Sequence, residues 1–458
     1  MIKLVVFDFD GVVADCKELH YEALNQALAE IDPASSISKE EHISIFDGLS
    51  TKKKLELLSI QKGFPTEHHN NVYDSKQNYT IVLLDKHLSY DARMFEIISK
   101  LKADGYLIYL ASNAIRRTLE VGLKALGIFN LFDKIYSNED VSNQKPHPQI
   151  YLQCMVNACV MPSETVIVED SKHGREAAAL SGAYVCGVDD PSDLTYEKVK
   201  KVIDAAPTTN IKWAGSDINI IIPMAGVGSR FQQAGYKLPK PLIDVDGKPM
   251  IQKVVESLNI DGRFIFIVKS EHCEQYNIDV MLKMYMPTCE VVKVSGPQGG
   301  AAKSVLEAKH LFNSNDHLII ANSDQMVEWN SCDFVYRMIS KNADGGILVF
   351  NDTNPKWSFA RLGPNGNVVE VAEKKPISDI ATVGIYYYKR GHEFVKYAEQ
   401  MIGKDFKVNN EFYVCPIFNE FIGDDKLMEI FHAKRMIGLG TPEDLEAYLS
   451  GLSDTVSP

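Results

Sequence analysis

Regular cysteine spacing is missing from this sequence. Its eight cysteines are scattered, and no two of them form a Cys-x-x-C pair. Structural zinc sites and disulfide frameworks both use recurring cysteine spacings, so we expect neither. Reduced, buried thiols are the prediction for all eight positions, which are Cys16, Cys154, Cys159, Cys186, Cys273, Cys289, Cys332 and Cys415.

Long apolar runs and an excess of positive charge are also missing. No stretch reaches the roughly 18 apolar residues of a membrane span, and the opening residues, MIKLVVFDFD, lack the serial regions of a signal peptide. With 48 Lys and Arg against 61 Asp and Glu, the formal net charge is −13. Such a surface repels nucleic-acid backbones and anionic membranes. We therefore predict a cytoplasmic protein that binds neither, and the sequence leaves its oligomeric state open.

Apolar runs that alternate with helical patterns are what the sequence does contain. The 458 residues, of which 45% are apolar, suffice for two or three domains with cores of their own. The runs are short and almost continuous, as in parallel strands covered on both faces. We therefore predict an α/β fold with parallel sheets, whose active sites lie beyond the carboxyl ends of the strands. The runs fall within 4–15, 106–112, 165–170, 183–188, 218–231, 263–268, 317–324, 345–350 and 383–388.

Two other segments divide the chain. Residues 16–90 have apolar residues three or four apart among many Lys and Glu, for example in 19–31, which indicates helices. A helical insertion directly after the first strand is placed to cover an active site as a cap. Residues 206–217 have a loop-like composition. We therefore predict an N-terminal domain at 1–205, a linker at 206–217 and a C-terminal domain at 218–458.

Polar side chains follow several predicted strands of the N-terminal half. Asp8 and Asp10 lie two residues apart where the first strand ends, so both can point into one site. A carboxylate can attack phosphorus to form an aspartyl-phosphate, and a second can protonate the leaving group and then activate water. Further carboxylates bind Mg²⁺, and a hydroxyl and a lysine bind phosphoryl oxygens. The other strand ends and loops supply these groups with Ser112, Lys145, Glu169 and Asp170.

These motifs resemble those of the haloacid dehalogenase superfamily over about residues 1–200. The matching segments are DFDGVV from Asp8, Ser112-Asn113, Lys145-Pro146 and Glu169-Asp170-Ser171 with Gly174. The resemblance implies an α/β domain with a cap and a Mg²⁺-dependent phosphatase.

The resemblance also implies a role for each residue. Asp8 is the nucleophile, and Asp10 is the acid and base. The implied Mg²⁺ site consists of Asp8, the backbone carbonyl of Asp10, Asp170, and Glu169 directly or through water. Ser112 and Lys145 bind the transferring phosphate, while Asn113 and His20 contact the substrate.

The cap resembles that of small-molecule phosphatases and also that of β-phosphoglucomutase. A mutase holds a second phosphate from its cap, typically through Lys-Gly-x-x-Arg, whereas this sequence has Asp47-Gly48-Leu49-Ser50-Thr51. An aspartate repels a phosphate dianion, so we favour the phosphatase. Three lysines that follow, Lys52, Lys53 and Lys54, keep the mutase open. His20 is equally consistent with a packing role in the cap.

A glycine-rich loop opens the C-terminal half. After the strand, Gly226 and Gly228 allow backbone amides to approach an anion, and Arg230 and Lys240 add positive charge for a triphosphate. The loop is not a Walker loop, because no Gly-Lys-[Ser/Thr] closes it.

The whole stretch resembles the sugar-1-phosphate nucleotidyltransferases over about residues 217–450. The matching segments are Gly-x-Gly-x-Arg-Phe, Pro-Lys-Pro-Leu at 239–242, Gly-Lys-Pro-Met at 247–250 and Gly-Thr-Pro-Glu-Asp-Leu at 440–445. The resemblance implies a Rossmann-like, GT-A-like domain that transfers a nucleotidyl group from an NTP to a sugar or polyol phosphate and releases pyrophosphate.

The implied roles are as follows. Arg230 and Lys240 bind the β- and γ-phosphates, and Asp324 binds Mg²⁺. Glu373 and Lys374 meet the acceptor phosphate. The loop with Gln298 and Gly300 binds the base, and Gly226 and Gly228 belong to the loop that approaches the phosphates of the NTP.

The sequence departs from this family at the metal site. Many members place an Asp two residues before the Gly-Thr-Pro motif, where this chain has Gly438. Either Asp324 alone suffices, or another acid such as Glu411 substitutes, so the metal count stays open. The prediction for the whole chain is a bifunctional phosphatase and nucleotidyltransferase with Mg²⁺ in both domains, acting in consecutive steps of glycan-precursor synthesis. The alternatives are a mutase with the same transferase, and a non-catalytic binding protein on these folds.

Overall fold

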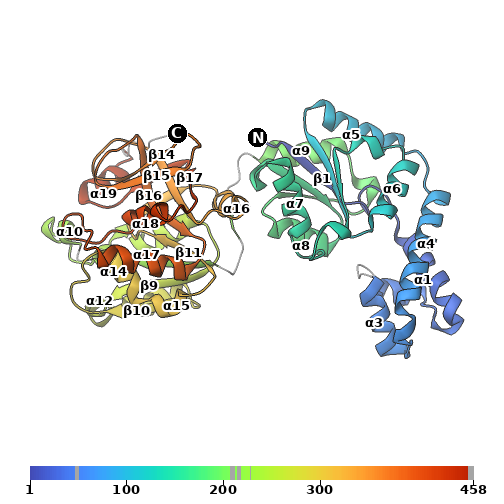
Figure 1. The fold of residues 1–458 in the computed structure, drawn as a ribbon, viewed down its shortest axis with the longest axis horizontal. Helices are drawn as coiled ribbons and strands as arrows, with labels where there is room; N and C mark the ends of the chain where they lie inside the picture. Colours follow the sequence, from blue (N-terminus) through green and yellow to red (C-terminus); the bar gives the residue numbers. More distant parts are fainter. Residues whose placement is uncertain (47–50, 207–211, 214–217, 227, 452–458) are drawn as a thin grey trace. The chain divides into compact units, whose positions relative to one another are not determined.

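The computed structural model describes residues 1–46, 51–206, 212–213, 218–226 and 228–451 (Figure 1). The chain forms two compact units, Met1–Thr209 and Asn210–Pro458. The division falls inside the predicted linker at 206–217, most of which lies outside the described residues.

The N-terminal unit contains a five-stranded parallel sheet in the order β3-β2-β1-β4-β5. The first strand, β1, lies in the middle and pairs with β2 on one side and β4 on the other. All four residues of β1 are buried, as the apolar run predicted. The strands are β1 Leu4–Phe7, β2 Leu107–Ala111, β3 Lys134–Tyr136, β4 Thr165–Glu169 and β5 Tyr184–Gly187.

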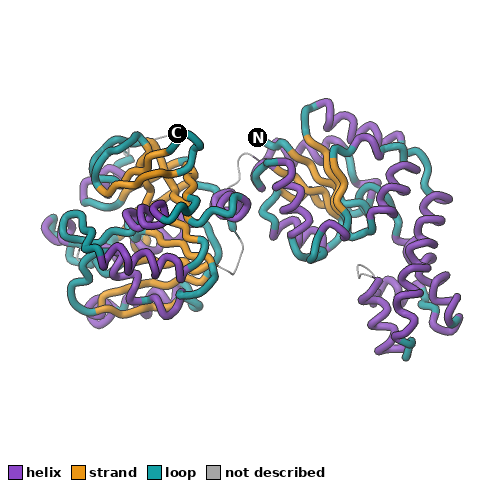
Figure 2. Tube along the Cα trace, viewed as in Figure 1, coloured by secondary structure: helices purple, strands orange, loops and turns teal. Residues whose placement is uncertain are grey.

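Helices cover this sheet, as Figure 2 shows. Buried residues of α5, α6 and α9 join those of β1, β2 and β4 in one apolar core, which includes Ile98, Leu123 and Val199. The helices are α5 Ala92–Ala103, α6 Arg116–Ala125, α7 Gln149–Ala158, α8 Lys172–Leu180 and α9 Tyr196–Ala205.

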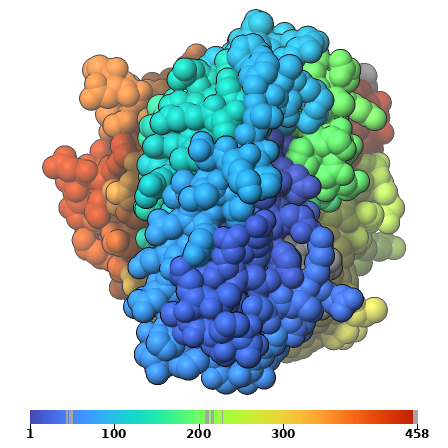
Figure 3. Space-filling view, turned by 90° about the vertical axis from the view of Figure 1, so that its right-hand side faces the viewer, coloured from blue at the N-terminus to red at the C-terminus, as the bar shows by residue number. Residues whose placement is uncertain are grey.

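The segment predicted to form a cap is helical and has a small core of its own. Leu24 and Leu28 of α1 pack with Leu58 of α3 and Val72 of α4. Figure 3 views the N-terminal unit with these blue helices in front. The helices are α1 Lys17–Ile31, α2 Lys39–Glu41, α3 Thr51–Lys62 and α4 His69–His87. A separate core lets this segment be positioned over the sheet as one body.

The C-terminal unit contains a nine-stranded mixed sheet, in the order β10-β9-β6-β11-β16-β13-β17, with β14 and β15 attached through β16. Four strands, β10, β9, β6 and β11, are parallel as predicted. The prediction of a parallel sheet is wrong for β16, which runs antiparallel to β11 and β13. The chain reaches β16 through the β14–β15 hairpin, and antiparallel strands need no helical crossover. The strands are β6 Ile218–Pro223, β9 Arg263–Lys269, β10 Glu290–Val294, β11 His317–Ala321, β13 Gly345–Asn351, β14 Ser358–Leu362, β15 Val368–Glu373, β16 Ile380–Tyr388 and β17 Met428–His432.

Smaller elements surround this sheet. The strands β12 Gln325–Glu328 and β18 Arg435–Gly438 form an antiparallel ribbon, and β7 Asp244–Val245 and β8 Lys248–Pro249 form a hairpin. The helices are α10 Ser229–Gln233, α11 Met250–Leu258, α12 Ser270–Tyr276, α13 Ile278–Tyr285, α14 Ala301–Glu307, α15 Lys309–Phe312, α16 Ser331–Ser340, α17 Gly391–Gly403, α18 Phe418–Gly423 and α19 Pro442–Leu449.

Two chain-wide expectations bear on this fold. All eight cysteines are free, and all are buried except Cys159, which is exposed at the end of α7. Across the described residues, no helix combines the length and apolar character that a membrane crossing requires.

Candidate active sites

A buried lysine joins the strand ends of the N-terminal sheet. Asp8 directly follows β1, and Glu169 is the last residue of β4. The Nζ atom of Lys145 lies 2.6 Å from Asp8 Oδ1, 2.7 Å from Glu169 Oε1 and 2.9 Å from the carbonyl oxygen of Ala111. Burial disfavours the charge on Lys145, but Asp8 and Glu169 together raise the pKa of Lys145. The structure thus brings three predicted residues into one charged cluster.

The loop that carries Lys145 is fixed by its neighbour at the end of β2. Asn113 accepts a hydrogen bond from the backbone N–H of Lys145 and donates a second to its carbonyl oxygen. Ser112 is buried, and its Oγ accepts from the backbone N–H of Ala114. Both predicted residues line the same cavity as Asp8, so their contacts to phosphate and substrate stay predictions that this placement allows.

The acidic residues at this edge form a group that fits a divalent cation. Ligand oxygens of Asp8, Glu169 and Asp170 all lie within 4.8 Å of one another. Asp170 Oδ1 is buried and has no hydrogen-bond partner among the described residues. Gly11 has φ +83°, and a Cβ atom there would lie 2.0 Å from Asp170 Oδ2, so only glycine fits beside this carboxylate. Carboxylate oxygens are the ligands that Mg²⁺ prefers, and an unpartnered buried oxygen supplies one.

Glu169 is already well occupied. Its Oε1 accepts from Lys145 and, at 2.6 Å, from the hydroxyl of Tyr151, while Ser171 donates to its Oε2. These contacts favour the indirect version of its predicted metal role, in which Glu169 positions Lys145 and reaches the metal through water.

The cap reaches the site through a chain of three polar side chains. His20 Nε2 lies 3.0 Å from Asp10 Oδ1, and Lys76 Nζ lies 3.3 Å from His20 Nδ1. Because Lys76 can only donate, we assign the His20 proton to Nε2, which donates to Asp10. Burial, aided by Lys76, lowers the pKa of His20, in agreement with a neutral ring. Burial alone would raise the pKa of Asp10, but the contact with His20 opposes burial and the pKa of Asp10 is lowered.

Lys76 is the main residue that sequence reasoning missed here. It is buried in α4, and burial lowers its pKa to about 8, with Lys54 adding to that shift. Lys17, Lys52 and Lys54 also line this cavity of about 610 Å³. Lysines on cap helices carry no motif, so only the packing of the cap reveals which of them face the site. Of the mutase-related segment Asp47-Gly48-Leu49-Ser50-Thr51, only Thr51 lies within the described residues, and it lines the cavity.

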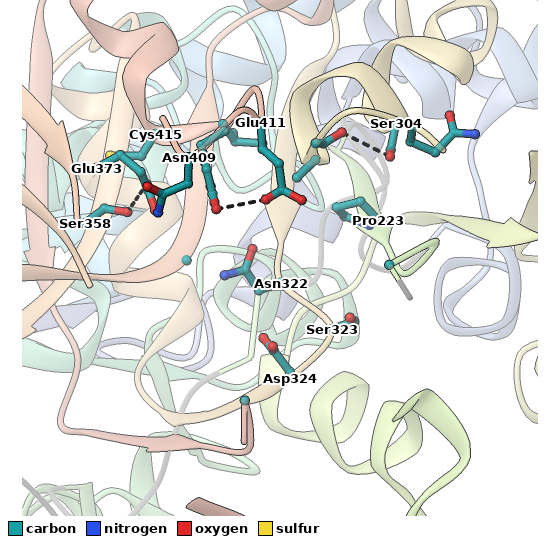
Figure 4. Close-up of a pocket in the computed structure, with 18 of the residues that line it drawn as sticks. Pro223, Ser304, Asn322, Ser323, Asp324, Ser358, Glu373, Asn409, Glu411 and Cys415 are labelled. Carbon is teal, nitrogen blue, oxygen red and sulfur yellow. Dashed lines mark hydrogen bonds between the residues drawn. The ribbon is translucent and has the colours of Figure 1, made fainter. Parts of the chain in front are cut away.

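A cleft of about 740 Å³ lies beside the strand ends of the C-terminal sheet. Most residues predicted for the transferase site line it: Gly226, Arg230, Gln298, Gly300, Asp324, Glu373 and Lys374. Gly228 stands at the N-terminus of α10 with φ +65°. Figure 4 shows Asn322, Ser323 and Asp324, which follow β11, across the cavity from Glu373 and Glu411.

Lys240 is paired with the predicted metal ligand. Its Nζ lies 2.5 Å from Asp324 Oδ2 and 3.1 Å from the carbonyl oxygen of Gly440. The predicted contact of Lys240 with the triphosphate therefore requires this ion pair to open. Arg230 is exposed on α10.

The predicted base-binding loop is held by backbone contacts. Phe412 N–H donates to the carbonyl oxygen of Gly299, and Ala302 N–H donates to that of Phe412. Gly300 has φ +121°, and a Cβ atom there would lie 2.4 Å from Phe412 O, so no side chain fits. Gln298 turns its amide to the carbonyl oxygens of Ser295 and Gly296. The loop is thus shaped by its own chain, and base contacts by these residues stay a prediction.

The opposite wall of the cleft carries the predicted acceptor residues. Ser358 donates to Glu373 at 2.5 Å, and burial raises the pKa of Glu373 (Figure 4). Lys374 Nζ donates to the hydroxyl of Tyr413 at 2.5 Å, and that hydroxyl donates to Glu411 at 2.9 Å. Glu411, the alternative metal ligand of the sequence analysis, is therefore engaged by Tyr413.

Other lining residues were missed. Lys269, Lys356, Trp357 and Asp444 all face this cleft. Asp444 lies in the matched Gly-Thr-Pro-Glu-Asp-Leu motif, which offered a signal. The segment from 244 to 249 is a short hairpin of β7 and β8, in which Lys248 lies in β8 and pairs with Glu256.

Comparison with known proteins identifies both units. The pattern of the haloacid dehalogenase-like hydrolase family matches residues 5–188, and that of the nucleotidyl transferase family matches residues 219–412. The Bacillus subtilis protein YhcW, whose assignment as a phosphatase is provisional, is 30% identical over 192 residues, which cover 40% of this chain and 81% of YhcW. The pyrophosphatase PpaX of Bacillus velezensis is 24% identical over 195 residues, which cover 41% of this chain and 83% of PpaX.

Solved structures are similar to parts of this chain as well. A nucleoside-diphosphate-sugar pyrophosphorylase from Vibrio cholerae is 25% identical, with a TM-score of 0.44, over 51% of this chain and 99% of that one. A β-phosphoglucomutase from Clostridium difficile is 22% identical, with a TM-score of 0.41, over 46% of this chain and 100% of that one.

Two observations assign the units to enzyme families. They are the matches to the two family patterns and the similarity to YhcW, which covers most of that protein. This chain belongs to the haloacid dehalogenase-like hydrolases through its N-terminal unit and to the nucleotidyl transferases through its C-terminal unit.

Proposed function

We propose that this chain is a bifunctional enzyme of nucleotide-activated glycan-precursor synthesis. The N-terminal unit hydrolyses a phosphate ester with Mg²⁺ through an aspartyl-phosphate, and the C-terminal unit transfers a nucleotidyl group from an NTP to a sugar or polyol phosphate. The observation that carries the proposal is the cluster of Asp8, Lys145 and the unpartnered carboxylate oxygen of Asp170 at one sheet edge.

The hydrolysis uses the residues in this order. An Asp8 oxygen attacks the phosphorus, the bond from phosphorus to the leaving oxygen breaks, and that oxygen takes a proton from Asp10. Asp10 then removes a proton from water, which attacks the aspartyl-phosphate and releases phosphate. Lys145 binds the phosphoryl oxygens with its charge retained. Bound Mg²⁺ would offset the repulsion between the anionic nucleophile and the anionic phosphate.

The test is to separate the two activities in the full chain. We expect Asp8→Asn to abolish phosphate release while pyrophosphate formation at the transferase site continues. The exposed Asp85 offers a matched control, since Asp85→Asn makes the same change on α4 away from the cavity. Loss of both activities in Asp8→Asn, with an unchanged circular dichroism spectrum, would contradict two independent sites.

Pyrophosphate is a second candidate substrate of the hydrolase site. The chain is similar to the pyrophosphatase PpaX, and the cap turns the ammonium groups of Lys54 and Lys76 toward the cavity. These charges suit a leaving group that is itself an anion. Hydrolysis of the pyrophosphate made by the transferase site would draw nucleotidyl transfer forward.

The substrate of the hydrolase site can be assigned by competition. With pyrophosphate and a panel of hexose phosphates, pyrophosphatase action predicts that wild type releases only phosphate during nucleotidyl transfer, whereas Asp8→Asn accumulates pyrophosphate. The same panel with a bisphosphate primer tests the mutase, because the cavity-lining Lys52 and Lys54 could hold a second phosphate. Interconversion of hexose phosphates faster than hydrolysis would assign the unit as a mutase instead.

The transferase reaction is an in-line attack of the acceptor phosphate on the α-phosphorus of the NTP. Arg230 and Lys240 bind the β- and γ-phosphates and stabilise the departing pyrophosphate, and Lys374 orients the acceptor from the opposite wall. Asp324 would hold Mg²⁺ when it is bound. Each NTP, tested against a panel of sugar and polyol phosphates with pyrophosphate detection, identifies the base and the acceptor. The absence of pyrophosphate formation with every pair would contradict the proposal.

A further inference from the structure

The transferase cleft lacks the carboxylate expected at position 438. The β12–β18 ribbon places Gly438 opposite Gln325, and the backbone N–H of Leu439 donates to the carbonyl oxygen of Asp324 at 2.8 Å. Position 438 is thus held beside the predicted metal ligand, but glycine offers it no oxygen.

Asp444 brings a carboxylate to the same place from another element. It lies in the first turn of α19, where the hydroxyl of Thr441 caps the helix by accepting from the Asp444 N–H. A Cβ atom built on Gly438 would lie 4.0 Å from Asp444 Oδ2. The carboxylate of Asp444 therefore approaches the space that a side chain at 438 would occupy.

Gly440 separates Asp444 from Asp324 and leaves the space between them open. A Cβ atom built on Gly440 would lie 3.7 Å from Asp324 Oδ2 and 3.7 Å from Asp444 Oδ2. Chain neighbours apart, these two oxygens are the only heavy atoms within 4 Å of that position among the described residues. The two oxygens are consequently no more than twice that distance apart, with no side chain from Gly440 between them.

Each of these carboxylates is neutralised by a lysine. Lys240 Nζ lies 2.5 Å from Asp324 Oδ2, and Lys356 Nζ lies 3.1 Å from Asp444 Oδ1. Two carboxylates this close repel each other, and the two ammonium groups offset that repulsion. A divalent cation between the carboxylates would supply the same two charges and would free both lysines for the phosphates of the substrates.

We infer that Asp444 is the second carboxylate ligand of the transferase metal site, in place of the missing acid at position 438. This inference rests on the proposed nucleotidyl transfer, which requires a metal at Asp324. The site then still has a second carboxylate beside Asp324. It comes from Asp444 on helix α19 and not from position 438 on strand β18.

Metal binding tests the inference directly. Mn²⁺ is titrated into the full chain by electron paramagnetic resonance with inorganic pyrophosphate present, and every variant also carries Asp170→Asn to remove the hydrolase site. We expect Asp444→Asn to weaken Mn²⁺ binding at least tenfold, as loss of a metal-supporting carboxylate does. Glu443→Gln, an exposed neighbour with the same charge change, leaves binding unchanged.

Two further variants separate a ligand from a structural residue. Lys356→Gln breaks the ion pair but keeps the carboxylate, so Mn²⁺ should bind as tightly as in wild type or more tightly; weaker binding would point to a structural role. Gly438→Asp combined with Asp444→Asn restores an acid at the family position, and its Cβ atom finds 3.4 Å to Trp357 as its nearest contact. We expect this double variant to recover Mn²⁺ affinity.

The outcomes distinguish this inference from the proposed function. Mn²⁺ binding by Asp444→Asn within twofold of wild type overturns the inference, and in that case a strong loss in Asp324→Asn leaves the transferase proposal standing. Unchanged binding in both variants would overturn the proposed metal site itself.

Discussion

Replacing Lys145 with methionine should destabilise the N-terminal unit strongly. Lys145 is buried against Asp8 and Glu169, which are themselves buried. Lys145→Met keeps the length of the side chain but leaves two carboxylates without their cation. Removing one partner of a buried ion pair typically costs about 3–5 kcal/mol, and here one cation serves two anions.

The assay can isolate this unit because all three tryptophans, Trp213, Trp329 and Trp357, lie in the C-terminal unit. Tryptophan fluorescence therefore follows only that unit, while the circular dichroism signal of helices reports on both. At a urea m-value of roughly 2 kcal/mol/M, the loss corresponds to a midpoint shift of about 1.5–2.5 M. We expect this shift in the circular dichroism transition and none in the fluorescence transition.

Lys134→Met is the matched control, because Lys134 is exposed on β3 and its ammonium contacts no carboxylate there, only the Asn157 amide oxygen and, at 5.8 Å, the ring of Tyr136 among the contacts described. A free energy of unfolding for Lys145→Met within about 1 kcal/mol of wild type would refute the reasoning. It would mean that Asp8 and Glu169 do not depend on this cation for their place in the fold.

The other predictions concern binding and loop shape. The pKa of Lys76 is lowered to about 8, so its ammonium group is charged below that pH and loses its proton as the pH rises through 8. If this charge binds the substrate, the KM of the wild-type hydrolase should rise above pH 8. In Lys76→Met the KM should be high at every pH. Arg230→Ala should lower kcat/KM for the NTP by about two to three decades, because contacts to developing charge contribute roughly 2–4 kcal/mol. The control Arg263→Ala, at the start of β9, should have no effect. Near-normal activity in Arg230→Ala would contradict the assignment of the glycine-rich loop to the triphosphate site. Lys374→Ala should weaken the acceptor and leave NTP binding measured by calorimetry unchanged, with the exposed Lys375→Ala as control; equal loss for both substrates would contradict its place on the acceptor wall. Gly300→Ala should destabilise the C-terminal unit by about 1–3 kcal/mol in the fluorescence transition, because the φ of Gly300 and its contact with Phe412 exclude a side chain. Gly226→Ala, at a position with open space around it, should leave the stability unchanged. A wild-type midpoint in Gly300→Ala would show that the loop moves away from Phe412.

Local patterns determined much of this molecule. Near-continuous apolar runs predicted β1, β2, β4, β6 and β11, because a strand buried on both faces has no polar positions. Asp8 and Asp170 could be assigned to one edge from the sequence, since parallel strands end at the same side of a sheet. The glycine-rich loop likewise predicted that Gly226 and Arg230 would line a cleft.

Contacts between distant segments could not be predicted in this way. The direction of β16 depends on the hairpin before it, and strand composition is the same in either direction. Lys76 faces the hydrolase site only because the cap helices pack as they do, and one helix face is chosen by tertiary contacts. Asp444 and Gly438 are only six positions apart in sequence. Whether the Asp444 carboxylate lies near position 438 depends nevertheless on how α19 packs beside β18. The periodicity of apolar residues indicates which face of a helix or strand is buried. Which other element packs against that face is determined only by the tertiary structure.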